Sequence, residues 1–299
     1  MSSFLALRAY KRKSLTSAGS VVAFVVAFLL VGTGLRGLNL FTFYFISMKA
    51  TKYKKEYKAT IDGTIASNGS SIRGASQVLA CSLLATILSL VHAFHCGSER
   101  AVVFNDDSSD IVLLSSRLTC GIIAHHATCL ADTLASELGI LSKSSPRLIT
   151  TWKSVPSGTN GGVTGTGFFW SAMGGLIIGI STLLFDFISG IDFSETRTNV
   201  DNISYVIRML MYSLTCGLLG SIIDSLLGAT VQQSYFDPDT KKIYQEEDRR
   251  PKTAALVVTS SANLLTNELV NLVSVVVTTF LGGFVLAPLF FGSALVAIR

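Results

Sequence analysis

Long apolar stretches dominate this chain and limit what it can fold into. They cover residues 18–34, 37–48, 75–95, 111–130, 167–190, 204–230 and 253–298. Only 14% of the 299 residues are charged, whereas a soluble domain has about 25%. A helix of roughly 20 apolar residues crosses the hydrocarbon core of a bilayer, so we expect about six to eight transmembrane helices. The predicted class is an all-α, polytopic integral membrane protein with a single domain over residues 1–299.

Two regions depart from the usual length of a span. The last stretch, 253–298, is long enough for two spans, and we expect a break between them near Gly282 and Gly283. The first two stretches are short, and we expect them to form one helical hairpin around Arg36.

The loops between the stretches alternate in charge. Clusters of lysine and arginine occupy segments 49–73, 138–166 and 231–252, whereas the two loops between these segments carry clusters of acids. The positive-inside rule then places the N-terminus and the three basic loops in the cytosol. We take the endoplasmic reticulum as the default membrane. The net charge of +5 fits basic loops at a membrane surface, and it gives no reason to expect a nucleic-acid partner.

The segment "ADTLASELG", residues 131–139, collects polar side chains where a span should end. On a helix Asp132 aligns with Ser136 and Thr133 with Glu137, so the four share one face about 140° wide. Carboxylates and hydroxyls together suit Mg²⁺ that keeps several waters and binds substrate phosphates. A solvent-exposed helix end is the alternative. Acids at a membrane edge are costly and usually functional, so we favour a site.

A glycine-rich loop follows, in "KSSPRLITTWKSVPSGTNGGVTGTG" at residues 143–167. Glycines allow backbone N–H groups to turn toward an anion, and the N-terminus of the next helix favours negative charge. The loop matches neither a Walker A motif nor a Rossmann fingerprint, and a flexible linker is the alternative. The residues that we expect to bind nucleotide phosphates are Arg147, Lys153, Gly158, Thr159, Asn160, Gly161 and Gly162.

Two later spans also carry polar side chains. Asp224 lies within the apolar "GSIIDSLLGATVQQ" and needs a partner or a metal. In "SANLLTNELVNLVS", Asn267 and Asn271 share a helical stripe with Glu268 beside it. We expect Asn267 and Asn271 to bind the nucleotide by orienting phosphates or metal ligands; hydrogen bonds between helices are the alternative. With the orientation above, all these groups approach one cytosolic cavity. The predicted metal ligands are Asp132, Glu137, Asp224 and Glu268.

Histidines and cysteines provide weaker signals. The five cysteines include no CxxC pair and lie mostly in apolar runs, so we expect free thiols. His92 and His125 fall toward opposite sides of the membrane, and we expect histidines to serve packing rather than metal binding.

Several segments resemble the transmembrane protein 19 family, also called domain of unknown function 92. They are "KRKSLTSAG", "GASQVLAC", "ADTLASELG", "PRLITTWKSVPSGTNGGVTGTG", "GSIIDSLLGATVQ" and "LTNELVNLVS". The resemblance runs over nearly the whole chain and is most specific from Asp132 through the glycine loop. Gly74 and Glu268 depart from the family pattern, which has asparagine and aspartate there; Glu268 keeps the carboxylate.

A plant member of this family is a phytyl-phosphate kinase. The resemblance therefore implies a Mg²⁺-dependent prenyl-phosphate kinase that moves a phosphoryl group from a nucleoside triphosphate, with CTP used by related polyprenol kinases, to an isoprenoid lipid phosphate. Asp132, Glu137, Lys153 and Asp224 would be its catalytic residues. The alternatives are a cytidylyltransferase-like enzyme, which would release diphosphate, and a transporter with acids spread through the bilayer. A homodimer is an alternative to a monomer.

Overall fold

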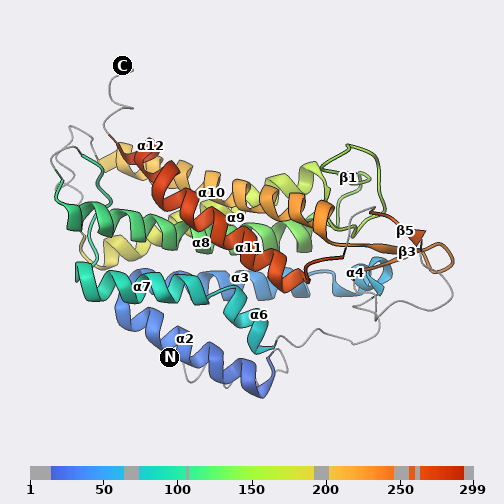
Figure 1. The fold of residues 1–299 in the computed structure, drawn as a ribbon, viewed down its shortest axis with the longest axis horizontal. Helices are drawn as coiled ribbons and strands as arrows, with labels where there is room; N and C mark the ends of the chain where they lie inside the picture. The colour runs from blue at the N-terminus through green and yellow to red at the C-terminus, as the bar shows by residue number, and fades with distance from the viewer. Residues whose placement is uncertain are drawn as a thin grey trace.

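The computed structural model describes residues 15–63, 74–105, 108–191, 202–245, 256–259 and 263–292. Long helices run side by side along the molecule, and short strands gather at one end (Figure 1). Among the described residues, three helices are long and apolar enough to cross a membrane, Gly165–Ile188, Ile203–Val231 and Asn267–Phe291. The shorter helices Ser17–Thr33 and Leu83–Cys96 are also apolar. The predicted all-α, multi-pass class is confirmed.

The elements follow in chain order. The described helices are α2 (Ser17–Thr33), η1 (Leu35–Leu38), α3 (Asn39–Lys52), α4 (Lys55–Ile61), α6 (Ala75–Ala80), α7 (Leu83–Cys96), α8 (Asp110–Gly139), α9 (Gly165–Ile188), α10 (Asn202–Val231), α11 (Asn267–Leu281), the π-helical η4 (Gly282–Leu286) and α12 (Ala287–Phe291). The described strands are β1 (Arg147–Leu148), β2 (Gly162–Val163), β3 (Tyr235–Asp237), β4 (Lys242–Tyr244) and β5 (Leu256–Val257).

The first two apolar stretches form the predicted hairpin. Thr16 caps α2 by accepting a 3.0 Å hydrogen bond from the Gly19 N–H, which satisfies one of the free amides at a helix start. The short 3₁₀ segment η1 contains Arg36 and turns the chain into α3.

The prediction of two spans in 253–298 is wrong for the residues that the structure describes. Residues 256–257 belong to β5, and Asn267–Phe291 is one helical span that passes through η4. The glycines serve close packing rather than a break. A Cβ on Gly282 would lie 2.5 Å from Ala124 Cβ, and one on Gly283 would lie 2.8 Å from the Arg117 carbonyl oxygen. A π-helical segment accommodates the extra residue without ending the helix.

Helix α8 occupies the centre of the bundle. It packs against α3, α7, α9, α10 and α11, and every residue from 119 to 131 is buried. Because other helices surround it, α8 can carry threonine, cysteine and histidine side chains that a lipid-facing helix would expose to hydrocarbon.

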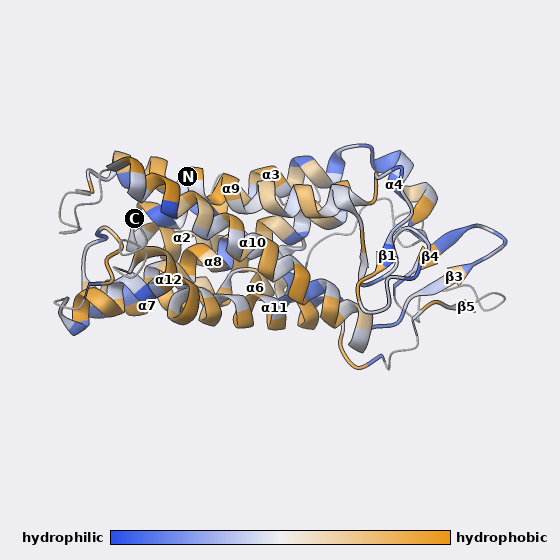
Figure 2. Ribbon diagram, turned by 90° about the horizontal axis from the view of Figure 1, so that it is seen from above, coloured by the Kyte–Doolittle hydropathy of each residue, from blue (hydrophilic) through white to orange (hydrophobic). Residues whose placement is uncertain are grey.

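One end of the bundle, which we call the sheet end, carries α4 and all described strands. Strands β1 and β2 pair antiparallel, with Arg147 opposite Val163. Strand β3 pairs antiparallel with β4 and with β5. Figure 2 shows hydrophilic residues concentrated at this end, whereas the helices are largely hydrophobic along their length. The η1 turn lies toward the other end, which we call the η1 end.

Candidate functional site

Asp132 of α8 and Asp224 of α10 meet inside the bundle near the sheet end. Their carboxylates interact directly with each other. Both helices contain 30 residues, and each aspartate lies about two turns before its helix ends. Two carboxylates at contact distance repel each other unless a proton or a cation lies between them. The structure thus brings together two of the four predicted metal ligands.

Small residues allow α8 and α10 to approach this closely. A Cβ on Gly220 of α10 would lie 2.3 Å from Thr128 Cγ2 of α8. A Cβ on Gly217 would lie 2.9 Å from the Gly175 Cα of α9 and 3.1 Å from the Ala131 Cβ of α8. Glycine at helix interfaces in membranes permits such backbone contact. The glycines just before Asp224 therefore set the separation of the two carboxylates.

Helix α11 orients the Asp224 carboxylate. Ser274 Oγ donates to Asp224 Oδ1 at 3.2 Å. With its amide turned so that nitrogen faces the acceptors, Asn271 Nδ2 lies 3.1 Å from the same oxygen and 3.2 Å from the Asn267 carbonyl oxygen. The predicted stripe on α11 thus reaches the carboxylate pair through Asn271 and Ser274. Asn267 is exposed at the helix start, and Glu268 beside it is half-buried.

Glu137 faces a different neighbour from Asp132. Its Oε2 lies 2.6 Å from Lys58 Nζ of α4. Among the described residues, no three His, Cys, Asp or Glu side chains come together to hold a metal ion, so the four predicted acids do not form one cluster. Lys58 was not predicted as a site residue, because nothing in its spacing separates it from the exposed Lys52 and Lys54.

The glycine loop packs against the last turns of α10. The Asn160 N–H donates to Ser234 Oγ at 2.9 Å, and Asn160 Nδ2 donates to the Gln233 carbonyl at 3.2 Å. Gly161 has a φ of +72°, and a Cβ there would lie 2.4 Å from Ala229 Cβ. Since Ala229 follows Asp224 by little more than one helical turn, the loop covers the sheet-end side of the carboxylate pair.

Part of the predicted phosphate cradle makes hydrogen bonds within the loop. The Gly162 N–H donates to the Thr159 carbonyl at 2.9 Å, and Thr159 Oγ1 donates to the Pro156 carbonyl at 2.7 Å. Gly158 has a φ of +88° and packs against Ile243 of β4. These contacts fix the loop's shape and tie it to the sheet.

The two predicted cations of this region lie at the surface. Arg147 is exposed and its Nη1 donates to the Trp152 carbonyl at 3.0 Å. The Lys153 side chain is also exposed. The structure therefore keeps both cations on the solvent side of the sheet end.

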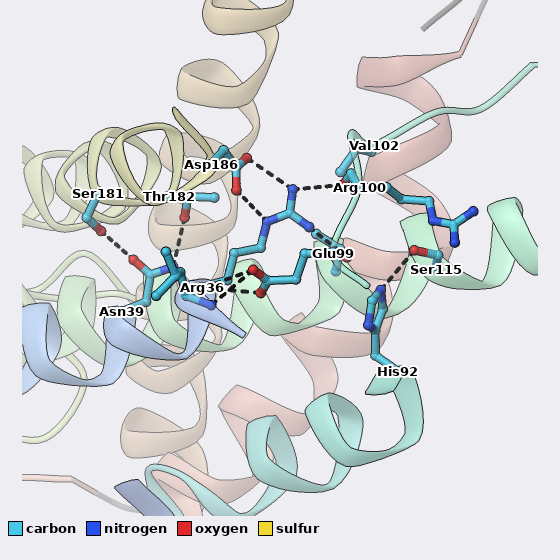
Figure 3. A network of polar contacts seen from close by, with 12 residues as sticks. Arg36, Asn39, His92, Glu99, Arg100, Val102, Ser115, Ser181, Thr182 and Asp186 are labelled. Atoms are coloured by element: carbon cyan, nitrogen blue, oxygen red, sulfur yellow. Dashed lines mark hydrogen bonds and ion pairs between the residues drawn. The ribbon is translucent and has the colours of Figure 1, made fainter. Parts of the chain in front are cut away.

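A second polar cluster, unforeseen from the sequence, lies toward the η1 end (Figure 3). Arg36 Nε lies 2.6 Å from Asp186 Oδ1, and both side chains are buried. The Glu99 carboxylate accepts from the Leu35 and Arg36 backbone N–H groups at 3.1 Å each. Burial raises the pKa of Glu99, and the charge of Arg36 opposes that shift. An aspartate inside the apolar stretch 167–190 was the available signal.

This second cluster is separate from the carboxylate pair. Arg36 Nη1 donates to Thr119 Oγ1 of α8 at 3.3 Å, and Thr119 precedes Asp132 by about 20 Å along the helix. Asn39 Nδ2 donates to Thr182 Oγ1 at 2.9 Å, and Ser181 donates to the Asn39 amide oxygen. The cluster binds η1, α3, α8 and α9 together.

His92, His125 and His126 are buried, whereas His95 is exposed. His92 Nε2 lies 2.8 Å from Ser115 Oγ, and His125 Nε2 lies 2.9 Å from the Cys81 carbonyl oxygen. All five cysteines are free thiols.

Comparison with known proteins identifies the family. The model of the integral membrane protein family DUF92 matches residues 1–279, which include both aspartates and the α11 stripe. The chain is 35% identical over 282 residues to Protein PGR of Arabidopsis thaliana, covering 94% of this chain and 92% of that protein.

Two microbial relatives are more distant. An uncharacterized membrane protein of Synechocystis is 27% identical, covering 75% of this chain and 74% of that protein. One of Methanocaldococcus jannaschii is 33% identical, covering 38% of this chain and 40% of that protein. No solved structure matches. The chain therefore belongs to the DUF92 family of integral membrane proteins.

Proposed function

We propose that this protein is a membrane-embedded prenyl-phosphate kinase, which transfers the terminal phosphoryl group of a nucleoside triphosphate to an isoprenoid lipid phosphate. The observation that carries the proposal is the contact between Asp132 and Asp224. A carboxylate pair held together by glycine packing is stabilised by a shared proton or a bound cation, and phosphoryl transfer needs a divalent cation beside the phosphates.

The donor set of the pair fits Mg²⁺. Carboxylate oxygens are hard ligands, and Mg²⁺ is usually held by one or two carboxylates together with water and substrate phosphates. Asp132 and Asp224 would hold the ion, with Asn271 and Ser274 fixing the Asp224 carboxylate. Bound Mg²⁺ would neutralise charge on the phosphates during transfer. Glu137 and Glu268 would act outside this pair.

The chemistry requires no separate base. An oxygen of the lipid phosphate attacks the terminal phosphorus of the nucleotide, and the bond to the departing nucleoside diphosphate breaks as the new P–O bond forms. The acceptor is already an anion, so no proton must be removed from it. Residues 158–162 would cover the nucleotide phosphates, and Arg147 and Lys153 would meet them from the solvent side.

The proposal also gives the protein an orientation. Nucleoside triphosphates are cytosolic, so the sheet end faces the cytosol, with the endoplasmic reticulum as the proposed membrane. CTP is the proposed donor.

The test is transfer of label from γ-labelled nucleotide. Purified full-length protein in nanodiscs is incubated with Mg²⁺, labelled CTP or ATP, and prenyl monophosphates of several chain lengths. We expect a labelled prenyl diphosphate. We expect Asp132→Asn to lower the rate at least about 100-fold, since even changes outside a metal's direct ligands cost about 10- to 100-fold.

Asp110→Asn is the matched control, because Asp110 is exposed at the far end of the same helix. Release of inorganic diphosphate, with CMP transferred to the lipid, would show that the enzyme is a cytidylyltransferase and not a kinase. Absence of turnover with every lipid and nucleotide would rule out the enzyme and favour a transporter.

A further inference from the structure

Lys58 is a buried cation close to the candidate site. Its side chain is 2% exposed. Its ammonium group donates to Glu137 Oε2 at 2.6 Å, to the Ala50 carbonyl at 2.7 Å and to the Thr51 carbonyl at 3.2 Å. Burying an ammonium is expensive unless it is paired. Glu137 keeps 22% of its side chain exposed, so it can leave toward solvent when another anion takes its place.

Two buried hydroxyls without partners lie on α3, the helix whose last carbonyls accept from Lys58. Ser47 Oγ and Thr51 Oγ1 are buried and have no hydrogen-bond partner among the described residues. They lie four residues apart on α3, and therefore on one face of it. The Thr51 carbonyl is itself a Lys58 partner. Buried polar groups are nearly always hydrogen-bonded, so two exceptions on the helix whose carbonyls hold Lys58 indicate a missing acceptor.

We propose that Lys58, Ser47 and Thr51 form the binding site for the phosphate group of the lipid acceptor. Glu137 forms an ion pair with the Lys58 ammonium until this phosphate displaces it. The inference rests on the proposed function for the identity of the lipid. A phosphate monoester offers three acceptor oxygens and up to two negative charges. It can accept from the ammonium and from both hydroxyls.

The position of the site favours a lipid over a nucleotide. Helix α3 continues from the apolar bundle into α4 at the hydrophilic sheet end (Figure 2). The surface between them exposes Tyr53 (55%) and Tyr57 (52%) together with Lys52 and Lys54. Tyrosine is enriched at the membrane interface, and basic side chains there attract anionic lipids.

The two subsites are built on the same end of α8. Glu137 follows Asp132 by about 7.5 Å along α8, on a different side of the helix. The acceptor phosphate at Lys58 and the nucleotide phosphates at the carboxylate pair would thus approach the same end of α8 from two directions.

The test is direct binding of farnesyl monophosphate to the full-length protein in nanodiscs, without nucleotide, by titration calorimetry. Farnesol supplies the same tail without phosphate, and CTP supplies phosphate without a tail. We expect the monophosphate to bind at least about tenfold more tightly than farnesol, a difference that a charge-assisted contact can provide. Lys58→Gln should remove this difference, and Lys143→Gln, at an exposed lysine of the loop after α8, should preserve it.

The two members of the ion pair should respond in opposite directions. Glu137→Gln removes the competing anion and should tighten monophosphate binding several-fold, whereas a purely structural pair would make both substitutions act alike. Lys58→Arg keeps the charge and covers the case in which Lys58→Gln does not fold; it should retain the preference for the monophosphate.

Equal effects of Lys58→Gln and Glu137→Gln, or an unchanged preference in Lys58→Gln, would overturn the assignment. If Lys58→Gln lost CTP binding and kept monophosphate binding, Lys58 would belong to the nucleotide site instead. Because no turnover is measured, the kinase proposal can fail while this site stands, and the reverse also holds.

Discussion

At the scale of single residues, two pairs of charged side chains contrast: one joins opposite charges and the other joins two acids. Arg36 and Asp186 are matched, with hydrogen bonds from Nε at 2.6 Å and Nη2 at 3.1 Å. Asp132 and Asp224 are both acids and have no basic partner in the described ion pairs. Matched pairs hold structure together, whereas unmatched acids imply a proton or a cation. On this contrast we propose a structural role for the Arg36–Asp186 pair and a metal-binding role for the Asp132–Asp224 pair.

The Arg36–Asp186 pair should therefore affect stability. Asp186→Ala leaves a buried guanidinium unpaired and should lower the free energy of unfolding by about 3–5 kcal/mol, whereas replacing both residues with apolar ones should cost much less. Denaturation of the purified protein in mild detergent measures both. A double variant as unstable as Asp186→Ala would contradict the assignment.

The sequence singled out both aspartates of the carboxylate pair, because an acid in an apolar run is costly wherever it lies. The same rule applied to Asp186, which was overlooked. Their partners could not be predicted. A helix that is apolar on most faces gives no periodicity to fix its rotation, so the sequence could not show that Glu137 turns to Lys58 while Asp132 turns to Asp224.

At the scale of elements, packing between helices determines the geometry of the site. Glycines 217 and 220 bring α10 against α8 and α9, and α11 adds its hydrogen bonds to Asp224. The hairpin around Arg36 followed from two short apolar stretches. The wrong division of the last stretch has a physical cause: Gly282 and Gly283 were interpreted as a helix break, but their missing side chains make room for Ala124 and the α8 backbone.

The separation of α8 and α10 should control how tightly the protein binds Mg²⁺. Gly220→Ala places a Cβ against Thr128 and should move α10 away from α8, at a cost of about 1–3 kcal/mol in stability. We expect the Mg²⁺ concentration for half-maximal activity to rise. Gly32→Ala is the control, because a Cβ there meets nothing within 4 Å. An unchanged Mg²⁺ dependence in folded Gly220→Ala would show that the carboxylate spacing does not matter.

At the scale of the whole molecule, the polar elements gather at one end of an apolar bundle. The proposal places that end in the cytosol; residues 1–14, which would carry the cytosolic N-terminus, lie outside the described residues. The single-domain organisation over 1–299 remains a prediction. Alternating loop charge predicted the orientation, but it could not predict the strands, because two- and three-residue strands leave no periodic pattern.

Orientation can be measured with introduced cysteines. Ser144 is exposed at the sheet end and Ser98 is exposed beyond the end of α7. In cells with a permeabilised plasma membrane, an impermeant maleimide should label Ser144→Cys at once and Ser98→Cys only after the internal membranes are dissolved. The opposite order would place the sheet end in the lumen and remove its access to cytosolic nucleotide.

The central claim is that Asp132 and Asp224 together hold the divalent ion. Electron paramagnetic resonance of Mn²⁺, used in place of Mg²⁺, can count bound ions on the full-length protein with nucleotide present. The account predicts a bound ion in the wild type and in Asp110→Asn, and its loss in both Asp132→Asn and Asp224→Asn while the proteins remain folded. Retention of the ion in both aspartate variants would contradict it.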